Sequence, residues 1–203
     1  GTDLIKKAEF HTQGESLDSR MKMTVIRGST ERNLEIRVWS VGKEKAVVKI
    51  LSPEKDRDTG NLRIKFDIWQ YLPNLERTIK IPPSMMLQSW MGSDFTNDDL
   101  VKTSSISRDY THKVVGEELV GGIKAYKIEC MPKIDAPVAW GKILIWLRVP
   151  DAVPVKHEYY SENGQLAKIM IGTDIKNFGG HSLATKLSMK LPRRPENETR
   201  LEY

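Results

Sequence analysis

The chain has 203 residues, of which 39% are hydrophobic and 29% are charged, and its formal net charge is +5 at pH 7. This balance supplies enough apolar material for a sizeable core, which excludes an intrinsically disordered chain. No apolar run approaches the roughly 18 residues that a membrane-spanning helix needs. The single cysteine, Cys130, excludes an intramolecular disulfide and every metal motif built from several cysteines.

The positive charge is spread through the chain. Lysines and arginines alternate with apolar residues, as at Arg63 and Lys65, and they are interleaved with acids instead of forming a dense basic block. This pattern is typical of a solvated sheet face, so we expect no nucleic-acid partner.

Apolar and polar residues alternate with period two in segment after segment, which predicts β-strands with one face toward a core or cavity. In chain order, the apolar positions of these strands are Met21, Met23 and Val25; Leu34, Ile36 and Val38; Ala46, Val48 and Ile50; Leu62, Ile64, Phe66 and Ile68; Ile79 and Ile81; those of 123–130; Ile143, Ile145 and Leu147 within 140–149; Ile169 and Ile171; and Leu183, Leu187, Met189 and Leu191.

Short turns connect the predicted strands. Glycine-containing pairs at predicted turns are Gly42-Lys43, Asn163-Gly164 and Gly179-Gly180, and the last two are strong hairpin signals. Gly121-Gly122 marks the start of the strand over 123–130. The alternation slips at Trp69 and Tyr71, which suggests a β-bulge. The strands number roughly ten, and this predicts one large antiparallel sheet curled on itself. Sheets of this kind at this length commonly form one unit, so we expect residues 1–203 to be a single domain.

Helical patterns are scarce and short. They cover residues 4–10, 84–91 and 96–102, and the last has Thr96 as N-cap with Asp99 in the capping-box position. The prolines at 82 and 83 end strand pairing just before the second helix. Methionines suit a surface that repacks against variable apolar partners. The Met-rich segment 84–91 therefore predicts a movable apolar cover over the sheet.

The sequence contains no motif that supports a catalytic or metal-binding role for its candidate residues. The carboxylates Asp94, Asp98, Asp99 and Asp109 do not have the spacing of an EF-hand, and turn or capping roles explain them better. The four histidines are widely separated, and no nucleophile elbow or phosphate-binding loop is present. We expect no enzymatic activity, no metal and no cofactor.

Aromatic and methionine side chains are the stronger candidates for a binding site. Core packing and ligand lining explain residues such as Trp69 and Trp140 about equally well. A curved sheet covered by a Met/Trp segment would, however, form a concave apolar pocket, the common form of a lipophilic ligand site. Ligand contact is favoured for the predicted cover at 85–91.

The string 88–101, Gln-Ser-Trp-Met-Gly-Ser-Asp-Phe-Thr-Asn-Asp-Asp-Leu-Val, resembles the signature of a LolA-like branch of bacterial outer-membrane lipoprotein-sorting proteins. The flanking segments 68–73, 77–81, 109–110 and 141–143 resemble the same branch. The resemblance implies an unclosed half β-barrel whose short helices cover a hydrophobic concave face that accepts acyl chains. It also implies a periplasmic location, with an export signal removed before Gly1.

We therefore expect a carrier for lipoprotein acyl chains or lipid, with an inner-membrane transporter and an outer-membrane acceptor as further partners. The expected ligand-binding residues of the cavity and cover are Ile36, Val38, Ile64, Phe66, Ile68, Met85, Met86, Trp90, Met91, Phe95, Ile143, Ile145, Ile169 and Leu187. One alternative is an accessory protein that binds lipid or another hydrophobe for an envelope transporter. The second, weaker alternative is a metal-dependent hydrolase that uses the carboxylates at 94–109.

Overall fold

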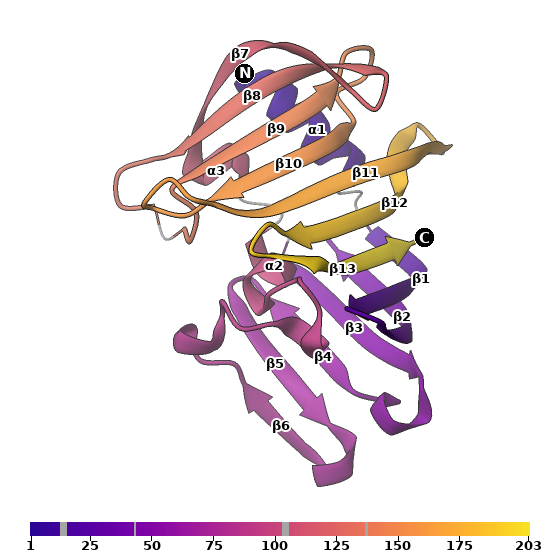
Figure 1. Cartoon of the computed structure of the whole chain (residues 1–203). Coiled ribbons are helices and arrows are strands. Elements are labelled where there is room, and N and C mark those ends of the chain that lie inside the picture. The colour runs from indigo at the N-terminus through magenta and orange to yellow at the C-terminus, as the bar shows by residue number, and fades with distance from the viewer. Residues whose placement is uncertain (13–15, 43, 103–105, 137) are drawn as a thin grey trace. The chain divides into compact units, whose positions relative to one another are not determined.

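The computed structural model describes residues 1–12, 16–42, 44–102, 106–136 and 138–203 (Figure 1). Its thirteen described strands form one antiparallel sheet, in the order β6-β5-β4-β3-β2-β1-β13-β12-β11-β10-β9-β8-β7. The order begins at β6 and ends at β7, so the sheet is not closed into a barrel. The prediction of a mainly β chain with a large unclosed antiparallel sheet and short helices is confirmed.

The chain divides into two compact units, and we describe each one by itself. The first unit comprises Gly1–Thr12 and Ser104–Pro195, and the second comprises Gln13–Thr103 and Glu196–Tyr203. The elements of the first unit are α1 (Thr2–Thr12), α3 (Ile106–Asp109), β7 (Tyr110–Val120), β8 (Ile123–Pro132), β9 (Lys142–Arg148), β10 (Pro154–Tyr160), β11 (Leu166–Phe178) and β12 (His181–Leu191).

The second unit holds the remaining strands and the short turns of 3₁₀ helix. Its elements are β1 (Ser16–Arg27), β2 (Thr30–Val41), β3 (Lys45–Ser52), η1 (Glu54–Asp56), β4 (Gly60–Ile64), β5 (Asp67–Leu72), η2 (Pro73–Leu75), β6 (Arg77–Lys80), η3 (Pro83–Met85), η4 (Trp90–Gly92), α2 (Asn97–Lys102) and most of β13 (Arg194–Glu202).

Helix α1 covers one face of the strands in the first unit. Its side chains Ile5 and Ala8 are buried against a cluster that includes Ile128, Ile145 and Tyr159. Direct cross-strand pairs join Ile128 to Ile145, Ile145 to His157, His157 to Met170 and Met170 to Met189, so this row lies on one face. We call this the covered face of the first unit. The expected helix at 4–10 is confirmed within α1.

Strand β9 is the apolar centre of the first unit, as its composition indicates. All five residues from Ile143 to Leu147 are buried. Ile145 faces α1, whereas Trp146 belongs to a second cluster with Ala125, Leu144 and Val155. Burial on both faces explains why this strand reads as a continuous apolar run instead of an alternating one.

The hairpin of β2 and β3 in the second unit is confirmed, with Ile36 paired to Ile50 and Val38 to Val48. Lys43 of its predicted turn lies outside the described residues. The single strand expected over 62–68 is wrong, because β4 ends at Ile64 and β5 begins at Asp67. The bulge expected after it is wrong as well, since β4 and β5 pair regularly from Gly60–Tyr71 to Ile64–Asp67. A turn at Lys65, whose φ is 55°, reverses the chain without a glycine signal.

The segment 82–100 follows β6, and we call it the cover segment. The helix expected over 84–91 is wrong: η3 and η4 are two separate short turns, and Ser89, which precedes η4, has a ψ of 125°, outside the helical range. The N-cap prediction is confirmed. The backbone N–H of Thr96 donates to Asp99 Oδ2 (2.8 Å), and the backbone N–H of Asp99 donates to Thr96 Oγ1 (3.2 Å).

Candidate functional site

The second unit has an apolar sheet face that the cover segment contacts. Cross-strand pairing places Met23 beside Leu34, Ile36 beside Ile50, and Val48 beside Asn61, all on this face. We call it the covered face of the second unit. The predicted ligand residues Ile36 and Val38 lie here by register, and Ile68 does too because it pairs with Arg63, two residues from Asn61.

Apolar side chains of the cover segment pack on this face. Met86 and Leu100 contact the buried pair Ile68 and Ile81. Trp90, only 4% exposed, donates its indole Nε1–H to Asn61 Oδ1 at 3.0 Å. The predicted residues Met86 and Trp90 are therefore brought together with Ile68. Met85, Met91 and Phe95 lie in the same segment, and Met85 is 37% exposed.

A buried carboxylate fixes the cover segment to the strands. Asp94 is 5% exposed and accepts hydrogen bonds from Arg27 Nη1 at 3.0 Å and Thr199 Oγ1 at 2.7 Å. The backbone N–H of Asp94 donates to the same Thr199 hydroxyl at 2.9 Å. Arg27 Nη2 also donates to the carbonyl of Gly92 at 2.7 Å. Sequence reasoning assigned Asp94 to a turn or cap and missed this role.

Two buried donors on the covered face keep unused hydrogen-bonding capacity. Arg32 donates through Nη1 to the carbonyl of Met91 (3.2 Å) and through Nη2 to Asp56 (3.0 Å), yet its Nε–H has no hydrogen-bond acceptor. Asn61 accepts from Trp90 but its Nδ2 group also lacks an acceptor. Buried N–H groups of this kind favour a ligand that carries a carbonyl or another acceptor oxygen.

The covered face of the first unit includes Ile143 and Ile145, each 2% exposed beneath α1. Polar groups also occur on this face. The Lys168 ammonium lies 4.7 Å from the Trp140 ring centroid and 4.8 Å from that of Tyr159. Burial lowers the pKa of His157 to about 4, so this imidazole is neutral at pH 7.

Three expected inward residues do not lie on the covered faces. Ile64 pairs with Asp67 and belongs to the opposite face of the second unit, and Phe66 lies in the turn that follows it. Ile169 pairs with Glu158 and Lys190, one residue out of step with Met170. Alternation fixes which residues share a face, but it does not say which face is covered. Leu187, paired with Gly172, lies on the covered face of the first unit by register.

Candidate metal-binding residues are not brought together. Asp94 and Asp99 have the roles described above, and Arg108 forms a salt bridge to Asp109. Within the described ranges, no group of three or more His, Cys, Asp or Glu side chains is placed to hold a metal ion. Among the same residues, no helix is both long and apolar enough to cross a membrane.

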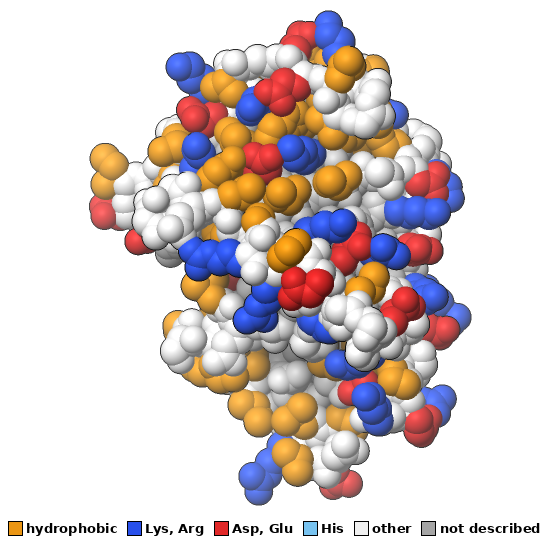
Figure 2. All heavy atoms as spheres, viewed as in Figure 1, with side chains coloured by type: hydrophobic (Ala, Val, Ile, Leu, Met, Phe, Trp, Pro, Cys, Tyr) orange, Lys and Arg blue, Asp and Glu red, His pale blue; other side chains and the backbone are white. Residues whose placement is uncertain are grey.

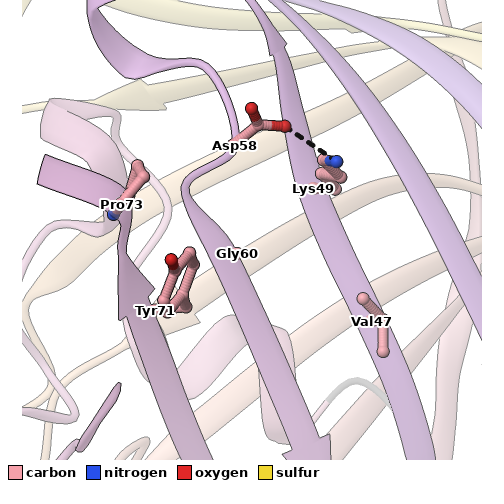
Figure 3. Close-up of a pocket in the computed structure, with 6 residues that line it drawn as sticks. All are labelled: Val47, Lys49, Asp58, Gly60, Tyr71 and Pro73. Atoms are coloured by element: carbon pink, nitrogen blue, oxygen red, sulfur yellow. Dashed lines mark ion pairs between the residues drawn. The ribbon is translucent and has the colours of Figure 1, made fainter. Parts of the chain in front are cut away.

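The opposite face of the second unit, which we call the open face, carries a groove of about 510 Å³. Figure 3 shows Val47, Lys49 and Tyr71 projecting from neighbouring strands around the backbone of Gly60. Lys49 Nζ lies 2.7 Å from Asp58 Oδ1 at one wall. Sequence reasoning missed this groove, because Gly60 is a single glycine that gave no signal by itself.

A family model described only as an uncharacterized protein matches residues 42–203. No curated protein matches the chain.

Three solved structures resemble the chain over nearly its whole length. A DUF1329 family protein from Desulfovibrio piger has a TM-score of 0.92 and 22% identity, and the match covers 99% of this chain and 88% of that one. A Vibrio parahaemolyticus domain described as an outer membrane lipoprotein-sorting protein has a TM-score of 0.88 and 21% identity, covering 100% and 89%. A LolA superfamily protein from Nitrosomonas europaea has a TM-score of 0.81 and 22% identity, covering 98% and 89%. These likenesses show a LolA-like fold.

The Asp94 contacts generate a prediction for Thr199→Val. The substitution keeps the shape of the side chain but removes the hydroxyl that forms two hydrogen bonds with Asp94. We therefore expect the free energy that holds the cover segment on the strands to fall by about 1–3 kcal/mol. Amide hydrogen exchange over 82–100 should accelerate by at least about fivefold. Thr185→Val is the matched control, because Thr185 Oγ1 donates to the carbonyl of Asp174 in the first unit. Equal exchange over 82–100 in both variants would contradict the assigned role of Asp94.

The neutral, buried His157 predicts a loss of stability in acid. Its pKa is about 4 in the folded chain and about 6.5 when unfolded, so unfolding takes up a proton as the pH falls between these values. The stabilisation is complete above pH 6.5 and declines by about 3 kcal/mol by pH 4. Urea unfolding at pH 7 and pH 5 should show that the wild type loses about 2 kcal/mol more than His157→Phe. Parallel losses in the two proteins would show that His157 does not titrate as described.

Proposed function

The chain belongs to the family of uncharacterized proteins whose model matches residues 42–203, and on its LolA-like fold we propose that it is a non-catalytic carrier of acyl chains. The cargo would be the acyl chains of lipoproteins or a free lipid, and the site would be the covered face of the second unit together with the cover segment. The observation that carries the proposal is the cover segment itself, an irregular Met- and Trp-containing segment packed on an apolar sheet face.

The chemistry of the covered face of the second unit suits a lipid. Its buried aliphatic side chains, including Leu34, Ile36 and Ile68, offer an apolar contact surface. Each methylene that an acyl chain moves from water to such a surface contributes about 0.8 kcal/mol. The unused N–H groups of Arg32 and Asn61 would donate hydrogen bonds to the ester or carboxyl oxygens at the head of the chain.

Entry of the ligand requires the cover segment to move, because its side chains occupy the face in this structure. Ile79, Met85 and Leu87 are 46%, 37% and 58% exposed, and they place apolar surface at β6 and the start of the segment. An acyl chain would meet these residues first and then compete with Met86 for the contacts of Ile68. The affinity is then the burial free energy less the cost of displacing the cover segment.

This balance also accounts for release. A carrier transfers cargo only when its affinity lies between those of a donor and an acceptor. We therefore propose a periplasmic location, an inner-membrane transporter as donor and an outer-membrane acceptor. The Vibrio parahaemolyticus structure, described as a lipoprotein-sorting domain with the same fold, supports this assignment.

Cargo identity separates this function from its nearest alternative. The protein should be purified from its own cells without detergent, extracted with organic solvent and analysed by mass spectrometry. Acylated peptides would support lipoprotein carriage. A lipid without a peptide would support an accessory lipid-binding protein of an envelope transporter. An extract that contains neither acylated peptide nor lipid would contradict the binding of acyl chains.

Met86→Asp tests the cover segment as part of the site. In the loaded protein residue 86 would close over the acyl chain, where a carboxylate carries a large desolvation cost. This cost outweighs the easier opening of the cover segment, so we expect the affinity for a fluorescent fatty acid to fall at least about tenfold. The control is Leu119→Asp, which adds the same charge at a residue that is 73% exposed in the first unit. Far-UV circular dichroism should show an intact sheet in both. Unchanged affinity in Met86→Asp would remove the cover segment from the binding site.

A further inference from the structure

The open face of the second unit carries a row of directly paired apolar side chains. Trp39 pairs with Val47, Val47 with Leu62, and Leu62 with Trp69, so the row crosses four neighbouring strands. Val47 and Leu62 are each 39% exposed. An exposed row of this kind, on strands that are each paired on both sides, is typical of a surface that contacts an apolar partner.

The row continues toward two adjoining hairpin turns. Val41, Ile64, Phe66 and Tyr71 are 66%, 38%, 55% and 40% exposed. The backbone N–H of Lys65 donates to the carbonyl of Glu44 at 2.7 Å, which ties the β4–β5 turn to the start of β3. The exposed apolar side chains thus belong to a connected set of strands.

Basic side chains accompany this apolar surface. The guanidinium of Arg37 lies 4.7 Å from the Trp39 ring centroid, and Lys80 Nζ lies 5.4 Å from that of Trp69. Arg37, Lys49 and Lys80 form ion pairs with Asp18, Asp58 and Asp67, respectively. Lys45, which pairs with Ile64, and the turn residue Lys65 add positive charge beyond these three pairs.

Exposed aliphatic residues flanked by tryptophan, tyrosine and lysine match the chemistry of a membrane interface. Tryptophan and tyrosine favour the headgroup level, lysine stems extend through apolar surroundings to the phosphates, and basic residues attract anionic lipids. We infer that the open face of the second unit docks this protein on the surface of an anionic phospholipid bilayer. Figure 2 shows hydrophobic side chains exposed among basic and acidic ones on one side of the chain. On the open face, the register places Trp39, Val47, Leu62 and Trp69 in one continuous row.

This docking surface is separate from the proposed acyl site, because Val47 and Leu62 face away from the covered face. It goes beyond the carrier function by placing the protein at a membrane when cargo is exchanged. The docking proposal and the carrier proposal can be tested separately. A variant that loses vesicle binding but keeps fatty-acid binding affects the open face alone.

The test is co-sedimentation of the full chain with vesicles of phosphatidylcholine mixed with phosphatidylglycerol, and with vesicles of phosphatidylcholine alone. We expect binding to the anionic vesicles that is several-fold stronger than to the neutral ones and that weakens with added salt. The double substitution Val47→Glu with Leu62→Glu should reduce binding at least about tenfold, because it opposes both the apolar and the electrostatic contacts. Fatty-acid binding should be unchanged.

Two further variants make the result specific. Val114→Glu with Leu119→Glu adds the same charge at exposed residues of β7, and it should bind vesicles like the wild type. Lys45→Gln with Lys65→Gln retains the apolar row and should reduce the preference for anionic vesicles several-fold. Equal binding by wild type and Val47→Glu with Leu62→Glu overturns the proposal. A second result would also overturn it: the wild type does not bind vesicles but self-associates, and the same double substitution abolishes the self-association. The open face would then be an interface between copies of this chain.

Discussion

Asp94 holds a negative charge in a place that is nearly closed to water, and this charge must be matched by groups from the strands. Arg27 and Thr199 supply that match from β1 and β13, while Asp94 itself belongs to the cover segment. A buried carboxylate that loses its partners costs several kcal/mol, so the cover segment has one strongly preferred position. The apolar contacts of Met86 and Trp90 depend on that position, and so does the proposed site beneath them.

The same arrangement explains how the face proposed to bind acyl chains stays covered in this structure. An exposed apolar face on an unclosed sheet would associate with other chains, and both units avoid this with a segment from outside their strands. In the first unit α1 buries Ile5 and Ala8 in the sheet. In the second unit the contact is mixed, because polar contacts of Asp94 and Arg32 accompany the apolar contacts of Met86. A mixed contact can be exchanged for an acyl chain more readily than a fully apolar one, since the freed polar groups regain water.

Structural features that depend only on residues close together in the sequence could be predicted from it. Thr96 and Asp99 form the predicted capping box, and the strand predicted within 140–149 is β9. The turn at Lys65 was missed because its residues have no turn preference and the alternation continues through it. The contact of Asp94 with Thr199 joins residues 105 positions apart, and no local pattern encodes such a pairing. The faces of Ile64 and Ile169 were misassigned for a related reason: alternation leaves open which side receives the cover.

The account rests on acyl chains binding beneath the cover segment, and photochemical crosslinking tests this directly. The delipidated protein would be equilibrated with a fatty acid that carries a photoreactive group in its chain, irradiated, digested and mapped by mass spectrometry. We predict labels on residues 82–100 and on covered-face residues of β2 and β5, reduced by unlabelled fatty acid. Labels confined to the open face, or none that unlabelled fatty acid reduces, would contradict the account.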